Sequence, residues 1–249
     1  MMNICVFDTE TTSLTKPFCY NVGYVIIDAD SWKIQARRSY VVEQIWHNLP
    51  LFNSAYYAEK RPIYVNEMRA RKTILEKFGY ICQQMIRDFK NFQVFHAYAY
   101  NSPFDDKVFS FNCDWYKCNN PFDNVQIHDI RGFVHSWIVG DVFKQFCDEN
   151  QYFTESGNYS TTAETVFRFI SGNKEFDEAH TALADAEIEA KILRACLECG
   201  AISTEDYPVQ RSIEREKRGF LRVVYPDGES QFTYKTMRIA KDRSAIYLR

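Results

Sequence analysis

Two carboxylates at the end of an apolar run are the first residues in this chain that could carry chemistry. The run at residues 4–7 stops at Asp8, and Glu10 follows two positions later. Side chains two apart in a strand point to the same side, so these two anions would repel each other. Burying them is costly unless a positive partner offsets their charge. The pair therefore predicts either a solvated strand end or a site that holds a metal ion, Lys or Arg.

Three residues further along the chain, Asp105, His180 and Asp185, lie at or next to the predicted starts of helices. Asp105 follows a Ser-Pro pair at 102–103, which is typical of a capped helix start with proline at the first helical position. Thr181 is a good N-cap, which places His180 in the preceding loop and Asp185 in the first turns of a helix. Singly, each acid is explained by the helix dipole, and His180 by a bond to a backbone carbonyl. Together they lie where α/β proteins gather their sites.

The order and spacing of these residues resemble the three motifs of the DEDDh exonucleases, a family that includes the polymerase proofreading subunit, ribonuclease T and oligoribonuclease. The matching motifs are Asp8-x-Glu10, Asn101-x-x-x-Asp105 and His180-x-x-x-x-Asp185. The resemblance covers residues 1 to about 200. It implies an α/β, ribonuclease H-like mixed five-stranded sheet flanked by helices, and 3'-to-5' removal of single nucleotides.

Phosphodiester hydrolysis needs an activated water and stabilised charge on the attacking and leaving oxygens, which two divalent ions roughly 4 Å apart can supply. Carboxylate ligands suit two Mg²⁺ or Mn²⁺ ions better than zinc. The family pattern implies that Asp8 bridges both ions, that Glu10 and Asp185 hold the ion that activates water, and that Asp105 serves the other. His180 would be the general base, with an unperturbed pKa near ~6.5.

The residues around the first motif are expected to face the substrate. Thr9, Thr11 and Thr12 offer backbone amides or hydroxyls that could grip the terminal nucleotide. Asn101 is expected to brace this side of the site and not to bind metal.

The composition of the 249 residues, with 46% hydrophobic and 25% charged residues, is ordinary for a soluble globular protein. No stretch reaches the ~18 uncharged apolar residues of a membrane helix. The first residues lack the pattern of a signal peptide, so we expect a cytoplasmic protein with no membrane partner. The net charge of −3 neither indicates nor excludes nucleic-acid binding, because bound metal ions cancel carboxylate charge.

Eight cysteines fit a reducing compartment. Cys113 with Cys118 and Cys196 with Cys199 could form a zinc site. The four-residue gap in the first pair and the position of the second pair late in a helix argue against it.

The apolar patterns predict a three-stranded antiparallel meander followed by alternating helices and strands. The expected strands are 3–8, 20–28, 33–42, 92–97 and 124–127. The expected helices are 54–59, 66–89, one from about 102, one capped by Asp129 and running to about 149, one capped by Ser160 or Thr161 and ending near 171, and one reaching about 199.

A domain boundary is expected near residue 205, which gives an exonuclease domain at 1–205 and a small basic β-hairpin appendage at 206–249. From Arg211 onward the chain has ten Lys or Arg against five acids, interleaved with aromatics. That composition suits phosphate contact and base stacking, although an ordinary hairpin packing its aromatics on the body explains it equally well.

The sequence thus predicts a 3'-to-5' exonuclease acting on single-stranded or frayed 3' ends, with DNA slightly favoured. The alternatives are an enzyme that trims RNA or oligoribonucleotides, and a proofreading accessory that docks on a polymerase or another replication protein. The segment from 155 to 180, with Val166, Phe167 and Phe169, looks similar to phage-encoded and bacterial members, which suggests a mobile or viral origin.

Overall fold

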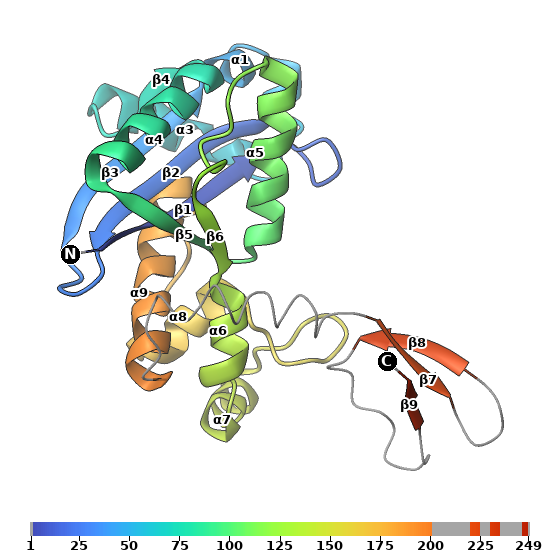
Figure 1. The fold of residues 1–249 in the computed structure, drawn as a ribbon. Coiled ribbons are helices and arrows are strands. Elements are labelled where there is room, and N and C mark those ends of the chain that lie inside the picture. Colours follow the sequence, from blue (N-terminus) through green and yellow to red (C-terminus); the bar gives the residue numbers. More distant parts are fainter. Residues whose placement is uncertain (1, 201–219, 225–229, 235–245, 249) are drawn as a thin grey trace. The chain divides into compact units, whose positions relative to one another are not determined.

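The computed structural model describes residues 2–200, 220–224, 230–234 and 246–248. The chain divides into two compact units, Met1–Thr204 and Glu205–Arg249. The first unit is built on a six-stranded sheet with the order β4-β3-β2-β1-β5-β6 (Figure 1). Its strands are β1 (Asn3–Thr11), β2 (Cys19–Asp28), β3 (Ile34–Val42), β4 (Ile74–Glu76), β5 (Val94–Ala99) and β6 (Gln126–Asp129).

The sheet is mixed, as predicted. Strands β1, β2 and β3 form the antiparallel meander, while β5 runs parallel to β1, β6 parallel to β5 and β4 parallel to β3. The predicted count of five strands was one too few, because β4 lies within the range predicted as a single helix at 66–89. The β4 residues Ile74 and Leu75 pair with Tyr40 and Val41 at the sheet edge. This pairing overrides a helix-like spacing of apolar residues.

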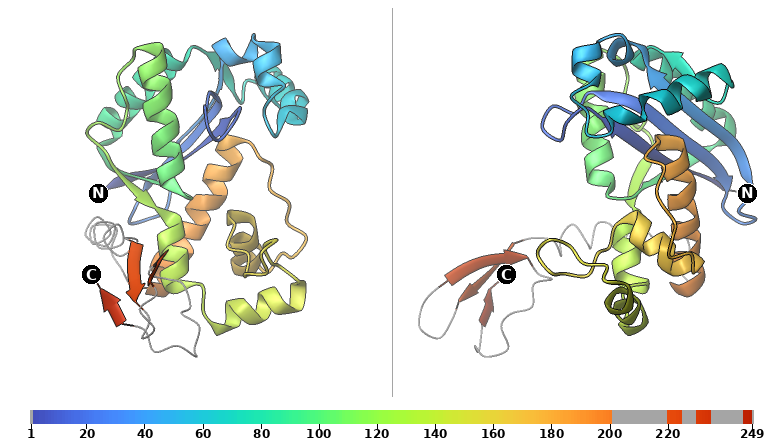
Figure 2. Two further views of the ribbon diagram at one scale, coloured as in Figure 1. Left: turned by 90° about the vertical axis from the view of Figure 1, so that its right-hand side faces the viewer. Right: turned by 180° about the vertical axis from the view of Figure 1, so that it is seen from behind.

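Helices cover both faces of the sheet (Figures 1 and 2). Helices α4 and α5 pack on one face, and α9 packs on the other against β1 and β2, flanked by α6 and α8. The described helices are α1 (Glu43–Trp46), α2 (Leu49–Phe52), the 3₁₀ helix η1 (Ala58–Lys60), α3 (Arg61–Arg69), α4 (Phe78–Phe92), α5 (Ser102–Tyr116), α6 (Ile130–Trp137), α7 (Asp141–Asn150), α8 (Ala163–Ser171) and α9 (Ala182–Gly200).

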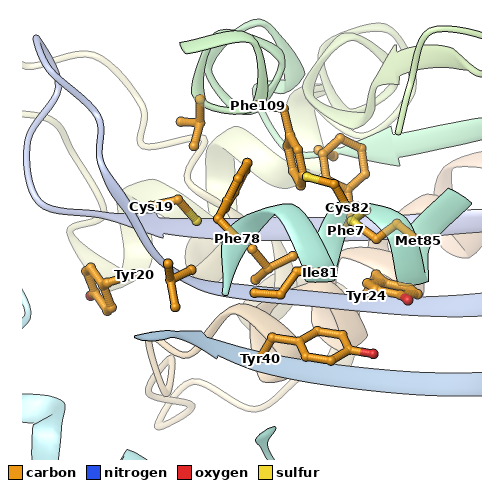
Figure 3. Packing of buried hydrophobic residues seen from close by; sticks show 14 of the residues in the cluster. Phe7, Cys19, Tyr20, Tyr24, Tyr40, Phe78, Ile81, Cys82, Met85 and Phe109 are labelled. Atoms are coloured by element: carbon orange, nitrogen blue, oxygen red, sulfur yellow. The ribbon is translucent and has the colours of Figure 1, made fainter. Parts of the chain in front are cut away.

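Alternation along β1 divides its side chains between these layers. Cys5 and Phe7 belong to the core under α4 and α5, where Phe7 lies 4.5 Å from Phe122 and 6.0 Å from Phe109, centroid to centroid. Figure 3 shows Phe7 and Phe109 close to Phe78 of α4. The other parity of the strand, which includes Asp8, points toward α9.

Several predicted boundaries moved. Strand β1 continues to Thr11 and does not end at Asp8, because its pairing with β2 extends through Glu10 and beyond. The helix predicted at 54–59 is wrong, because α2 ends before this range and only the 3₁₀ helix η1 overlaps its end. The helix predicted from 129 to 149 is split into α6 and α7. Helix α8 is capped by Thr162, one residue later than the latest expected position.

The second unit contains strands β7 (Phe220–Val224), β8 (Ser230–Tyr234) and β9 (Ile246–Leu248), in the antiparallel order β8-β7-β9. The turn of the predicted hairpin, between β7 and β8, lies outside the described residues. Most of the basic residues of the predicted appendage also lie outside them. Within the described part of the chain, every helix is too short or too polar to cross a membrane.

Candidate active site

Strand β1 brings Asp8 and Glu10 to the wall of an open pocket with a volume of about 250 Å³. Both face the same side of the strand, as their spacing predicts, and they stand opposite Gly23 and Asn21 of β2. Glu10 accepts a hydrogen bond from the hydroxyl of Tyr20 at 3.3 Å. The central strand of the sheet thus carries two carboxylates of the site.

Helix α5 brings Asp105 into the same pocket. The helix begins one residue after an abrupt turn at Asn101, which has a left-handed φ of 65°, and whose amide donates to Asp129 at 3.0 Å. Asn101, and not Ser102 as predicted, occupies the N-cap position, a left-handed conformation that Asn tolerates better than most residues. The buried Asp105 carboxylate accepts a hydrogen bond from the hydroxyl of Thr9 at 2.6 Å.

Helix α9 reaches the pocket because its first turn lies directly on strand β2. A Cβ atom at Gly23 would stand 2.0 Å from the amide nitrogen of Leu183 and 2.2 Å from the carbonyl carbon of Ala182, so only glycine fits there. The amide of Ala182 donates to the side chain of Asn21 at 2.8 Å. This contact places Asp185, one turn into α9, opposite the strand that carries Asp8.

His180 lies in the loop before α9, as predicted, with a left-handed φ of 52°. Its ring stacks on Tyr57 with centroids 4.1 Å apart, and its Nδ1 atom lies 3.8 Å from Glu178. Burial, followed by the nearby Lys60, lowers the pKa of His180 below its ordinary value. The imidazole is therefore neutral at pH 7 and able to accept a proton.

Two further carboxylates line the pocket that the sequence motifs did not include. Glu189, which is buried, accepts a hydrogen bond from the amide of Tyr100 at 3.1 Å. Its spacing of four from Asp185 puts both on one face of α9, and that spacing could have identified it. Glu178 comes from an irregular segment, and nothing in its local sequence distinguishes it from the neighbouring acids.

The pocket is therefore strongly acidic. None of the described residues that line it is Lys or Arg, and six are carboxylates: Asp8, Glu10, Asp105, Glu178, Asp185 and Glu189. Burial, reinforced by mutual repulsion for all except Asp8, raises the pKa of every one of them, to about 7 for Asp8 and Glu178 and about 10 for Asp185. Such a cluster can be fully ionised only if cations enter it.

The donor atoms fit divalent cations. One atom from each of Glu10, His180 and Asp185 lies within 4.8 Å of the others. The Oδ1 atom of Asp185 is buried and has no hydrogen-bond partner among the described residues, which is costly for a carboxylate oxygen and is relieved by a metal ion. A donor set dominated by carboxylate oxygens suits Mg²⁺ or Mn²⁺.

The residues expected on the substrate side divide into two groups. Thr9 lines the pocket, but its hydroxyl is engaged by Asp105. Thr11, Thr12 and Asn101 do not line it, and the amide of Thr12 donates to the carbonyl of Phe18 at 3.0 Å. A nucleotide contact by these residues stays a prediction.

Comparison with solved structures gives the same architecture. The chain is similar to a 3'-exonuclease whose structure is described as showing 3'-end specific recognition of a histone mRNA stem-loop. The TM-score is 0.56, with 12% identity over 96% of this chain and 93% of the other. The nuclease domain of 3'hExo, a DEDDh family member bound to rAMP, matches with a TM-score of 0.50 and 14% identity over 80% and 92%. The chain has the DEDDh 3'-exonuclease fold.

Exonuclease I of E. coli in complex with a dA16 oligonucleotide shares this DEDDh fold, with a TM-score of 0.52 and 12% identity over 93% of this chain. The present chain spans about half (51%) of that enzyme's length. No family model and no curated protein matched the sequence. The likeness to these solved structures is therefore one of fold, at sequence identities of 12–14%.

Proposed function

We propose that this protein is a divalent-metal-dependent exonuclease that hydrolyses phosphodiester bonds at the 3' ends of single-stranded or frayed nucleic acid. One observation carries the proposal: three separate segments of a DEDDh fold bring Asp8, Glu10, Asp105, Asp185 and His180 into one acidic pocket. A buried cluster of like charges destabilises a fold, and a cation site accounts for it better than a structural role does.

The four motif carboxylates, Asp8, Glu10, Asp105 and Asp185, would hold the ions. Two Mg²⁺ or Mn²⁺ ions would stabilise the charge that develops on the attacking and leaving oxygens. The chain itself supports this arrangement, since Thr9 fixes the Asp105 carboxylate and Tyr20 fixes that of Glu10.

His180 would act as general base toward the attacking water. Its lowered pKa keeps the imidazole neutral near pH 7, and stacking on Tyr57 fixes the plane of the ring. The Glu178 carboxylate lies 3.8 Å from Nδ1, where its charge would favour a proton on Nδ1 and leave Nε2 as the acceptor. Glu178 is thereby a positioning residue for His180.

The substrate class is a single strand with a free 3' end. Solved structures of this fold include complexes with rAMP and with dA16, so the fold alone does not decide the sugar. Following the sequence analysis, we take single-stranded DNA as the first substrate and RNA as the alternative.

The decisive experiment is a time course on single-stranded DNA and RNA of one sequence, labelled at the 5' end. It is run with Mg²⁺, with Mn²⁺ and with chelator. A metal-dependent ladder that shortens from the 3' end supports the proposal, and the faster substrate identifies the preferred sugar. A folded protein that binds both strands and cleaves neither would contradict it.

For residues 206–249 we propose a supporting role in holding the strand, based on their ten basic residues from position 211 onward. Removing them should weaken strand binding and reduce its salt dependence, while cleavage of saturating substrate continues. Co-purification with a polymerase that is lost on the same truncation would instead favour a docking role.

A further inference from the structure

Three cysteine side chains meet between helices α4 and α5, within the core on the α4–α5 face of the sheet. Cys82 comes from α4, Cys113 from α5, and Cys118 follows the end of α5. Their sulfur atoms all lie within 4.8 Å of one another, and those of Cys82 and Cys113 are 3.9 Å apart. Cys82 and Cys113 are buried, whereas Cys118 is partly exposed.

The backbone fixes this arrangement. Helix α5 ends at Tyr116, and the left-handed φ of 54° at its C-cap, Lys117, turns the chain back so that the amide of Cys118 donates to the carbonyl of Cys113 at 3.1 Å. Gly79 of α4 lies beneath Cys118, and a Cβ there would be 3.4 Å from the Cys118 Cβ. The three thiols are thus held together by two helices and a tight turn.

We propose that Cys82, Cys113 and Cys118 bind one thiolate-preferring d¹⁰ cation of the Zn²⁺ class, at a site separate from the acidic pocket. Two thiolates on one tetrahedral Zn²⁺, each about 2.3 Å from the metal, are about 3.8 Å apart. The Cys82–Cys113 separation of 3.9 Å already matches this geometry. Three soft sulfur ligands also select against Mg²⁺ and Mn²⁺.

The exposure of the cluster also supports metal binding. The partial exposure of Cys118 gives an ion access from solvent and leaves the fourth coordination position open on that side. The bound ion would tie α4 to the last turn of α5, the helix whose first turn carries Asp105.

The competing explanation is that the thiols are small hydrophobic residues filling the core. A titration of the reduced, full-length protein with Cd²⁺ separates the two explanations, because cadmium bound to thiolates absorbs in the ultraviolet and cadmium bound to carboxylates does not. We expect a charge-transfer band that saturates at one equivalent.

Cys118→Ser should weaken this binding by roughly 10²-fold or more, since loss of a direct ligand costs at least as much as loss of a group that orients one. Cys199→Ser is the matched control, because Cys199 is an exposed thiol outside the cluster, and its titration should match that of the unaltered protein. Absence of the band in the unaltered protein, or an equal band in Cys118→Ser, would overturn the proposal.

A second measurement needs no variant. Zn²⁺ should protect Cys118 from alkylation, read residue by residue by mass spectrometry, while the exposed Cys199 reacts at the same rate with and without the ion. Equal alkylation of Cys118 in both conditions would also overturn the proposal, whatever the folding of the serine variant.

Discussion

Helix α5 carries proposed metal-ligand side chains at both of its ends, and the two ends differ in physical character. Its first turn places Asp105 in the acidic pocket, among five other carboxylates. Its last turns place Cys113 between Cys82 and Cys118. The carboxylates repel one another, so their proximity costs free energy in the absence of cations, whereas neutral thiols pack in an apolar core at little cost.

Because the carboxylates repel one another and the thiols do not, only the acidic pocket requires specific contacts to keep its residues close together. The acidic pocket depends on a close contact at Gly23, on a left-handed turn at Asn101 and on hydrogen bonds that fix single carboxylates. The thiol cluster needs only two packed helices and a turn. We therefore expect changes in the pocket to alter activity strongly, and the thiol cluster to affect mainly stability.

The largest expected effect is that of Asp185→Ala. Removing a carboxylate with an unpaired buried oxygen should reduce hydrolysis by several orders of magnitude. It should leave the fold intact, because it also relieves repulsion. Initial rates on end-labelled single strands measure the loss, and circular dichroism checks the fold. The matched control is Asp141→Ala, which removes an exposed acid from the first turn of α7 and should not change the rate. Unaltered hydrolysis by Asp185→Ala would contradict the site assignment.

His180→Ala should lower turnover by roughly 10²- to 10⁴-fold, the usual contribution of a general base. If His180 is a base and not a ligand, calorimetric titration with Mn²⁺ should show nearly unaltered binding. Its closeness to Glu10 and Asp185 makes this a sharp test, since all three could reach one ion. His47→Ala, at an exposed position, is the control. Loss of Mn²⁺ binding together with turnover would make His180 a ligand.

Gly23→Ala tests whether the pocket depends on the close approach of α9 to β2. The added methyl group would overlap backbone atoms of Ala182 and Leu183, which cannot move without shifting the helix. We expect a loss of roughly 1–3 kcal/mol in the free energy of unfolding, measured in urea, and a reduced hydrolysis rate. Gly140→Ala, where no atom lies within 4 Å of the new methyl, should change neither. Equal stability of both variants would show that α9 can be repositioned freely.

The sequence predicted which five motif residues meet in one pocket, for a physical reason. Two of them, Asp8 and Glu10, lie in the last part of strand β1. The other three lie in or just before the first turn of a helix, and the order of all five along the chain follows the order of these elements. Glu178 escaped prediction because a loop has no periodicity. The three-thiol cluster escaped because Cys82 lies far in sequence from Cys113, and only the packing of α4 on α5 brings them together.

The errors in the predicted fold arose where tertiary contacts outweighed local pattern. Leu75 fits the helical spacing of apolar residues over 66–89, yet residues 74–76 form β4 because an open edge of β3 offers hydrogen-bond partners. The N-cap of α5 lies not at Ser102 but at Asn101, where Asp129 at the end of the neighbouring strand β6 accepts the Asn101 amide. Neither partner can be recognised from the local sequence.

The smallest expected effect is the pH dependence of stability without metal. Burial raises the pKa of Asp8 and Glu178 to about 7, so the folded protein retains protons that the unfolded chain has already released. The resulting stability is present in acid and is lost as the pH rises through about 7. In chelator, we expect the Tm measured by calorimetry to fall by roughly 5 °C or more between about pH 5 and about pH 8.

Saturating Mn²⁺ should flatten this slope, because the ions replace the protons. Cys118→Ser should leave the slope in chelator unaltered, because burial raises the pKa of the Cys118 thiol to about 11, well outside this pH range. A Tm that stays constant or rises with pH in chelator would mean that the six carboxylates do not strain the fold. The two ends of α5 would then differ only in ligand type, carboxylate against thiol. The repulsion between carboxylates would no longer support a cation site in the pocket.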